Sequence, residues 1–340
     1  MKASIKDIAM DTGLSIATVS KYLRNVTIRT ENKLRIEEAI NRLGYVPNRN
    51  AQMLRSGKTY TIGVVIADLS NSFWGSIVDY IEEYLQQHGY MTVIYSGQEI
   101  ETEGRYLSNI LAQNLDGLII VLKNQDHDAY LPKIERRLPI VLIDQKSTHY
   151  PIDTVTSDNY GAGKKAANYL MSMGHTRIGI ITAWRNIYTI SERLRGFLDG
   201  VAEGNCHVES KQIVEGPMTS GSGKELFARL MRQELPPEVV FSTNLDVGLG
   251  ALVEANMQGY RIGKDISFIS IDDDELFAGM IPPITVVTQD VKQIGFESAR
   301  LLLDKLNNKT NEKQKTIYIE TELIVRDSVS NKLVRDKECQ

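Results

Sequence analysis

The chain changes its pattern near residue 60, and this change most constrains the fold it can adopt. Beyond Thr61, short apolar runs rich in β-branched residues alternate with longer stretches of helical periodicity. Strands separated by helices are typical of parallel sheets that are covered on both faces. Roughly ten or more strands are too many for one such sheet, so we predict two α/β lobes. The clearest runs are 62–67, 92–95, 117–122, 140–143, 178–182, 239–242 and 266–271.

The first 45 residues predict three short helices instead. Ser4–Asp7 has the pattern of a capping box that opens the first helix, and Gly13 permits a tight turn after it. Ser15 is a suitable cap for a second helix over 16–23, and a third helix is expected from residue 30 to residue 44. Helices joined by so short a turn indicate a helix-turn-helix unit.

The second of these helices is the one that would enter the DNA major groove. Hydroxyl and lysine side chains there suit phosphates, and small apolar side chains suit thymine methyl groups. A small helical bundle without a DNA function would show the same periodicity, so the pattern leaves both interpretations open. The positions that face outward are Ile16, Ala17, Thr18, Ser20 and Lys21.

Charge is distributed unevenly along the chain. Met1–Thr59 holds eleven Lys and Arg but only five Asp and Glu, although the whole chain carries a net charge of −4. A basic segment attached to an acidic body favours a polyanion as partner of the segment. A generic basic arm would have the same sign of charge.

Other sequence features point to a cytoplasmic protein without a metal or a cofactor. The two cysteines are too few for a disulfide framework, and no zinc-ligand spacing occurs. The N-terminus has no apolar core of a signal peptide, and no run of about 18 apolar residues predicts a membrane span. We therefore expect no membrane partner.

An enzyme is the first alternative function. The acidic run Asp272–Glu275 is compatible with paired carboxylates or a metal site. The five histidines are scattered, however, and no nucleophile elbow is present. Gly221–Lys224 departs from a phosphate-binding loop, because Met218 and Glu225 replace its glycine and hydroxyl residue. We therefore predict a protein that is not an enzyme.

Spaced motifs in the first 48 residues closely resemble the DNA-binding head of the lactose/galactose repressor (LacI/GalR) family of transcriptional regulators. The resemblance implies that Ile16, Ala17 and Lys21 read bases. Two departures from the family are Arg24 and the pair Lys33-Leu34. The motifs are Ile5-Lys6-Asp7-Ile8-Ala9, Gly13-Leu14-Ser15, Thr18-Val19-Ser20 and Leu43-Gly44-Tyr45 with Pro47-Asn48. Residues placed at or near phosphates are Ser15, Thr18, Ser20, Tyr45 and Asn48.

The segment after this head has helical spacing but is short. Ala51, Leu54 and Arg55 fall on one face, yet an isolated helix of this length is marginal in water. The resemblance implies a hinge helix that folds on DNA, with Ala51 and Leu54 as DNA contacts and Leu54 as a minor-groove wedge. A flexible linker with one buried leucine is the alternative.

The resemblance continues through the body and implies the two-lobed fold of periplasmic sugar-binding proteins. We therefore expect an all-α helix-turn-helix head over 1–46, a hinge and linker over 47–59, an effector-binding and dimerisation domain over 60–330, and a polar tail over 331–340. The N-lobe is predicted at about 60–160 plus 291–320, and the C-lobe at about 161–290 plus 321–330.

A ligand between two such lobes is expected at the carboxyl ends of the strands. Arg193 matches the family's ligand-bridging arginine, and its fork suits vicinal hydroxyls or a carboxylate. Asp272 matches an acid that accepts hydrogen bonds from ligand hydroxyls or amines, whereas Leu245 replaces the family's usual acid. Met218 and Gln145 are weaker candidates. The expected effector-binding residues are Phe73, Trp74, Asp158, Arg193, Asn244 and Asp272.

The resemblance predicts a repressor whose affinity for its operator is switched by a sugar or sugar derivative. A homodimer would read a near-palindromic DNA operator. The tail carries no leucine heptad, which favours a dimer over a tetramer. A phosphorylated carrier protein stays open as an additional partner. A sugar-transport binding protein without DNA function is the alternative to a regulator.

Overall fold

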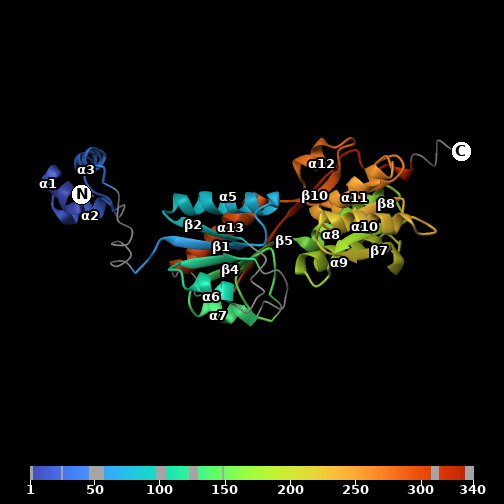
Figure 1. The fold of residues 1–340 in the computed structure, drawn as a ribbon, viewed down its shortest axis with the longest axis horizontal. Coiled ribbons are helices and arrows are strands. Elements are labelled where there is room, and N and C mark those ends of the chain that lie inside the picture. The colour runs from blue at the N-terminus through green and yellow to red at the C-terminus, as the bar shows by residue number, and fades with distance from the viewer. Residues whose placement is uncertain are drawn as a thin grey trace. The chain divides into compact units, whose positions relative to one another are not determined.

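The computed structural model describes residues 3–23, 26–45, 57–96, 105–121, 129–147, 149–307 and 314–333. The chain forms two compact units, Met1–Thr59 and Tyr60–Gln340 (Figure 1). Each unit has its own hydrophobic core. Within the described ranges, no helix has the length and apolar character needed to cross a bilayer.

The N-terminal unit is a bundle of the helices α1 (Ile5–Thr12), α2 (Ile16–Tyr22) and α3 (Thr30–Leu43). The capping box is present, since Ser4 accepts from the Asp7 amide and the Asp7 carboxylate accepts from the Ser4 amide. Gly13 and Gly44 end their helices in the left-handed conformation, which glycine adopts without a steric penalty. The predicted helix-turn-helix architecture is confirmed. Its buried core contains Ile8, Ala9, Val19, Ile36, Ala39 and Tyr45.

The N-lobe of the larger unit contains a six-stranded sheet in the order β11-β5-β4-β3-β1-β2. All neighbouring strands are parallel. Val65 pairs with Tyr95 of β2 and with Ile120 of β3, which places β1 between these two strands. The strands are β1 (Thr61–Ile66), β2 (Met91–Ser96), β3 (Gly117–Ile120), β4 (Ile140–Ile143), β5 (Thr154–Ser157) and β11 (Thr316–Ile319).

Helices cover both faces of this sheet (Figure 1). Alternate residues of a strand point to opposite faces, so Val64 packs with the cluster of α5 (Ser72–Gln87) and α13 (Val291–Leu306). Its neighbour Val65 packs on the other face, with residues of α6 (Arg105–Leu111) and α7 (Leu131–Glu135). This double coverage explains why the strands read as continuous apolar runs.

The C-lobe sheet has the order β12-β10-β9-β8-β6-β7. Its strands are parallel except β12, which runs antiparallel to β10 at the edge. The strands are β6 (Ile178–Ala183), β7 (Ile213–Gly216), β8 (Val239–Ser242), β9 (Ser267–Ile271), β10 (Thr285–Gln289) and β12 (Thr321–Ile324). The helices of this lobe are α8 (Asn159–Ser172), α9 (Tyr188–Glu203), α10 (Ser220–Met231), α11 (Leu245–Met257), α12 (Glu275–Gly279) and the 3-10 turn η3 (Ser210–Gln212).

The chain passes between the lobes three times, after β5, after β10 and between β11 and β12. The predicted class of a helix-turn-helix head plus two mostly parallel lobes is confirmed. Strand lengths differ from the sequence pattern, since β3 ends at Ile120 where the apolar run extends to residue 122. Strands β5 and β10 are fully formed although Thr, Ser and Gln interrupt their apolar character, because pairing partners on both sides fix them.

Candidate functional site

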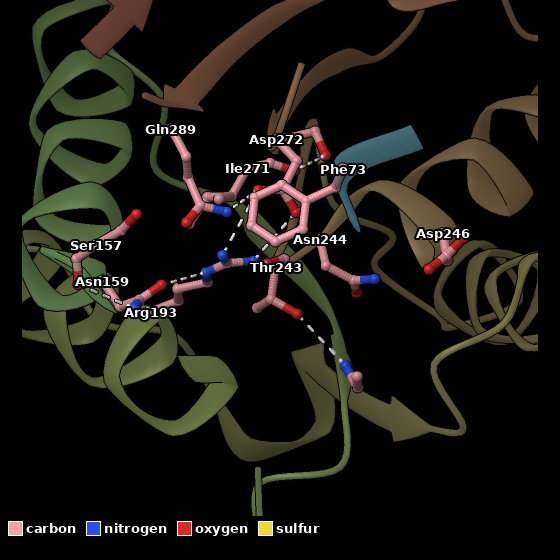
Figure 2. A network of polar contacts seen from close by, with 12 residues as sticks. Phe73, Ser157, Asn159, Arg193, Thr243, Asn244, Asp246, Ile271, Asp272 and Gln289 are labelled. Atoms are coloured by element: carbon pink, nitrogen blue, oxygen red, sulfur yellow. Dashed lines mark hydrogen bonds and ion pairs between the residues drawn. The ribbon is translucent and has the colours of Figure 1, made fainter. Parts of the chain in front are cut away.

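Polar side chains gather where the strands of both sheets end (Figure 2). The carboxyl edge is where open parallel sheets place ligands, because loops diverge there. Asp144 follows β4, Ser157 ends β5, Asn244 follows β8, Asp272 follows β9 and Gln289 ends β10. We call these five residues, together with Asn159 and Arg193 that contact them, the interlobe cluster.

Arg193 is the centre of the interlobe cluster and is only 4% exposed. Its Nε donates to Asn159 Oδ1 at 2.8 Å, and its Nη1 donates to the Thr243 carbonyl oxygen at 2.9 Å. Nη1 and Nη2 also face the Asp272 carboxylate, at 3.2 and 3.5 Å. A buried guanidinium needs such partners, because an unpaired charge in a protein interior is costly.

The position of Arg193 depends on close packing of α9 against α8. A side chain at Gly163 of α8 would place its Cβ 2.0 Å from the Arg193 carbonyl oxygen. In the same way, a Cβ at Gly196 of α9 would lie 2.0 Å from the Tyr160 carbonyl oxygen. These two glycines let the backbones approach, and the approach brings Asn159 within reach of the arginine.

Asp272 occupies an unusual backbone conformation. Its φ of 74° lies in the left-handed region, which aspartate and asparagine tolerate better than most residues. Its amide donates to the Val287 carbonyl oxygen at 2.9 Å, and Gln289 Nε2 donates to its Oδ1 at 2.5 Å. The turn thus directs the carboxylate toward Arg193 and Gln289.

Asp144 is the N-lobe acid of the interlobe cluster and has a similar backbone, with φ at 62°. Its amide donates to the Val155 carbonyl oxygen at 2.9 Å, and its own carbonyl oxygen accepts from Thr156 Oγ1 at 3.0 Å. Burial raises the pKa of the Asp144 carboxyl to about 6, with Arg193 lowering the pKa and Asp272 raising it. The two charged C-lobe residues are therefore close enough to influence this N-lobe acid.

Four buried oxygens of the interlobe cluster have no hydrogen-bond partner among the described residues. They are Asp144 Oδ1, Ser157 Oγ, Asn244 Oδ1 and Gln289 Oε1. Buried polar atoms are almost always paired, so each unpaired one calls for an explanation such as a bound ligand. Each lobe contributes two of the four, which indicates a site shared by both lobes.

Two hydrogen bonds connect the lobes beside this cluster. Asn71 Nδ2 donates to Asp246 Oδ2 at 3.4 Å, and Ser72 Oγ donates to Asp274 Oδ2 at 2.8 Å. Burial, together with the nearby charges of Asp272 and Asp68, raises the pKa of Asp246. Sequence reasoning noted the missing acid at Leu245, and the structure shows that the next residue provides a carboxylate at this edge.

Asp273 and Asp274, which follow Asp272 in the acidic run, have structural partners. Asp273 forms a bidentate pair with Arg326, at 2.7 and 2.8 Å. Asp274 caps α12 by accepting from the Leu276 amide at 2.9 Å. Among the residues that the structure describes, no three metal-ligating side chains lie together.

The two expected aromatic residues have different surroundings. Trp74 is 8% exposed and lies in the N-lobe core, with its ring edge-on to Phe73 at a centroid distance of 5.1 Å. Phe73 is half-buried at the start of α5, next to the two residues that bond across the lobes. The packing of Trp74 gives it a structural role, and contact of either ring with an effector stays a prediction.

Asp158, Gln145 and Met218 complete the candidates from the sequence. Asp158 is the cap of α8 and accepts from the Gly161 amide at 2.8 Å, so its position already has a structural reason. Gln145 is buried beside Asp144, whereas Met218 follows β7 with 37% exposure. Sequence reasoning missed Asp144, Ser157, Asn159, Asp246 and Gln289. The signal for Asp144 was available, since it follows an apolar strand as Asp272 does.

The N-terminal unit presents the expected side chains of α2 at its surface. Ser15 caps α2 by accepting from the Thr18 amide at 3.1 Å, and Ile16 is 50% exposed. Ala17 and Lys21 are exposed, and Thr18 and Ser20 are half-buried. Tyr45 is buried in the core of the head, which leaves its expected phosphate contact a prediction. Asn48, Ala51, Leu54 and the residue Arg24 lie outside the described residues.

Two family descriptions match the chain. Residues 4–48 match the bacterial regulatory proteins of the lacI family. Residues 59–327 match the periplasmic binding proteins and sugar binding domain of the LacI family. Together these matches span the head and both lobes.

Curated relatives match over almost their full length. The transcriptional regulator DegA of Bacillus subtilis is 30% identical over 335 residues, covering 97% of this chain and 99% of DegA. The transcriptional repressor CytR of Escherichia coli K12 is 29% identical, covering 96% of each chain.

Solved structures agree in fold. A lac repressor dimer bound to operator and the anti-inducer ONPF has a TM-score of 0.82 at 24% identity, covering 97% of this chain and 100% of the repressor. A complex of the transcriptional regulator CelR with cellobiose has a TM-score of 0.73 at 26% identity, covering 96% of this chain and 100% of CelR.

Proposed function

Because this chain belongs to the LacI family of bacterial regulatory proteins, we propose that it is a repressor whose operator affinity is set by a small carbohydrate bound at the interlobe cluster. Membership in a family of transcriptional regulators removes the enzyme alternative. Residues 4–48 match the bacterial regulatory proteins of the lacI family, and this match removes the alternative of a transport protein without DNA function.

The interlobe cluster carries the proposal for the effector site. Arg193 brings Asn159, Asp272 and the Thr243 carbonyl together at the carboxyl edge of the C-lobe sheet, beside Asp144 of the N-lobe. Ligand sites in proteins typically orient a ligand with a few well-placed polar groups. A relative with 26% identity was solved with cellobiose, which supports a carbohydrate as ligand.

DNA recognition is assigned to the exposed face of α2. Ile16 and Ala17 contact base edges, and Lys21 contacts a phosphate or a guanine edge. Ser15, Thr18 and Ser20 contact phosphates, with Tyr45 and Asn48 near the backbone. Ala51 and Leu54 contact the minor groove, where Leu54 wedges a central base step.

A homodimer reading a near-palindromic operator is the proposed assembly, because two-fold symmetry in the protein requires a symmetric site. Its effector domain spans about 60–330, with an N-lobe of 60–160 plus 291–320 and a C-lobe of 161–290 plus 321–330. The head spans 1–46, the hinge and linker 47–59, and the tail 331–340. The protein works in the cytoplasm.

The switch follows from closure of the lobes. Asn71 and Ser72 bond across the lobes and Asp144 is buried, which supports the proposal that a ligand enters when the lobes part. A ligand that prefers one lobe arrangement shifts the equilibrium and changes DNA affinity, typically by about 1–3 kcal/mol. Phe73, Trp74, Asp158, Asn244 and Asp272 are assigned to ligand binding with Arg193. A phosphorylated carrier protein is a second candidate regulator that the family leaves open.

Selection of bound duplexes from a random DNA pool tests this function. We expect the full-length protein to enrich a two-fold symmetric consensus with a flexible central step. Sugars are then added to the purified complex to find those that change operator affinity. No enrichment, with or without sugar mixtures, would contradict the proposed function.

A further inference from the structure

The unpartnered oxygens of the interlobe cluster define what a ligand must offer. The amide oxygens Asn244 Oδ1 and Gln289 Oε1 can only accept hydrogen bonds, and Asp144 Oδ1 can only accept them when its carboxyl is ionised. Ser157 Oγ can accept or donate. The amide of Gln289 is oriented by its own contact, since Nε2 donates to Asp272 and Oε1 is left for another donor. A matching ligand is therefore rich in donors.

Gln289, Asn244 and Ser157 belong to one connected network, and Asp144 lies close enough to Arg193 for the guanidinium to lower its pKa. Gln289 bonds Asp272, and Asp272 pairs with Arg193. Arg193 bonds the carbonyl of Thr243, which directly precedes Asn244. Asn159 Nδ2 donates to the Ser157 carbonyl at 3.0 Å and so links the network to the end of β5. One ligand placed against Arg193 is thus close to all of them.

Arg193 itself has little capacity left for an anion. A guanidinium has five N–H donors, and the protein's own acceptors already engage Nε, Nη1 twice and Nη2. Its charge is balanced by Asp272, which lies 3.2 Å away. A phosphate or carboxylate on the ligand would have to displace these partners.

The acids around Arg193 outnumber it. The charge of Asp272 raises the pKa of the Asp144 carboxyl, and the charges of Asp272 and Asp68 raise the pKa of Asp246. Burial strengthens such interactions, because the interior screens charge poorly. An anionic group would therefore meet repulsion at this site, whereas hydroxyls or an ammonium group would satisfy the unpartnered carboxylate and amide oxygens.

We infer that the effector is a carbohydrate without a phosphate or carboxylate, which donates to both lobes through hydroxyls or a protonated amine. This inference rests on the proposed function and narrows its ligand class. Asp144 is the N-lobe residue that sets this charge selection, with Asn244 and Gln289 as the amide acceptors of the C-lobe.

Matched sugars that differ only in charge test the inference. The full-length protein is mixed with glucose, glucosamine, glucose 6-phosphate and glucuronate, with the same four forms of galactose, and with ribose, ribose 5-phosphate and cellobiose. Binding is measured by the shift of the thermal midpoint and by calorimetry. We expect a neutral or amino sugar to bind, and its phosphorylated or carboxylated form to bind at least about tenfold more weakly.

Asp144→Asn is the discriminating variant, because asparagine has the same shape and tolerates the left-handed backbone at this position. The variant should bind the best ligand more weakly. The ratio of its affinity for the neutral sugar to its affinity for the anionic form should fall by about tenfold. Asp265→Asn is the control, since this exposed acid pairs with Arg261 on its own turn, at 2.7 Å. The control should leave both affinities unchanged.

Two outcomes would overturn the inference. Tighter binding of a phosphorylated or carboxylated sugar than of its neutral form would contradict the charge selection. Absence of binding by every sugar would contradict the ligand class. In either case, retained enrichment of a symmetric operator would leave the proposed regulatory function standing, so the two failures are distinguishable.

Discussion

Arg193 Nη1 lies 3.2 Å from Asp272 Oδ2, and this ion pair between a buried arginine and a half-buried aspartate joins α9 to the turn after β9. The arginine is fixed by its helix, and the aspartate is fixed by a left-handed backbone. Neither side chain therefore needs a ligand to reach its position. The site is preorganised, which reduces the entropy lost when a ligand binds.

Arg193→Met should destabilise the protein by about 3–5 kcal/mol, because the Asp272 carboxylate, only 14% exposed, then loses its cationic partner and keeps the hydrogen bond from Gln289. Urea unfolding followed by circular dichroism measures this loss. The double variant with Asp272→Asn should recover part of the stability, since it removes the orphaned charge. Purely additive losses in the double variant would show that the two residues are not energetically coupled.

Asp144→Asn should stabilise the ligand-free protein at neutral pH. The folded-state pKa of about 6 lies above the unfolded value of 3.8, so the folded state holds the proton more tightly between these values. Stability from this group is therefore present below pH 4 and is lost as pH rises through 6, at a cost of roughly 2–3 kcal/mol. Arg193 and Asp272 are the charged groups that influence it.

Unfolding free energies of wild type and Asp144→Asn between pH 4 and pH 8 provide the test. We expect the two curves to meet near pH 4, to diverge between pH 4 and pH 6, and to stay apart above pH 6, with the variant more stable. A variant that is less stable at pH 7 would contradict the burial of an uncompensated carboxyl. Greater stability combined with weaker sugar binding is the trade-off expected of a functional residue.

Gly163→Ala should destabilise the C-lobe, because the new Cβ would lie 2.0 Å from the Arg193 carbonyl oxygen. The helices must separate, at a cost of about 1–3 kcal/mol, and Arg193 moves with α9. Gly75→Ala on α5 is the matched control, since a Cβ there meets nothing within 4 Å. The control should be neutral or stabilising by up to about 1 kcal/mol. Equal thermal midpoints for both variants would contradict the close approach.

Lys21→Ala should weaken operator binding and reduce the slope of log affinity against log salt by about 1 if the lysine contacts a phosphate. Lys33→Ala is the control, because Lys33 lies on α3 and pairs with Glu37 at 3.8 Å. Fluorescence anisotropy of a labelled operator at several salt concentrations separates the two variants. An unchanged affinity and slope for Lys21→Ala would remove this residue from the interface.

Much of the fold was predictable because its signals are local. The capping box at Ser4, the turn at Gly13 and the β-branched runs each specify an element without reference to distant residues. Double coverage of the sheets followed from the same runs. Strands β5 and β10 were less visible, since polar residues interrupt them and their neighbours in the sheet determine their structure.

The candidate site was predictable only in part. Arg193 and Asp272 follow from motifs, and both lie in the interlobe cluster. Asn159 and Gln289 act through contacts with residues 34 and 17 positions away, which no local pattern encodes. Trp74 shows the converse, because an aromatic residue at a helix start suits a ligand platform and a core equally well, and burial places it in the core.

Asn244→Ala offers the most direct test of the central claim that a ligand at the interlobe cluster controls DNA binding. Its Oδ1 has no partner among the described residues, so truncation removes a ligand contact at little cost to the fold. Operator affinity is measured by anisotropy with and without the sugar that shifts wild type. We predict equal affinities for ligand-free wild type and variant, and a sugar response that is lost or needs at least about tenfold more sugar in the variant. An unchanged sugar response in Asn244→Ala would contradict the account.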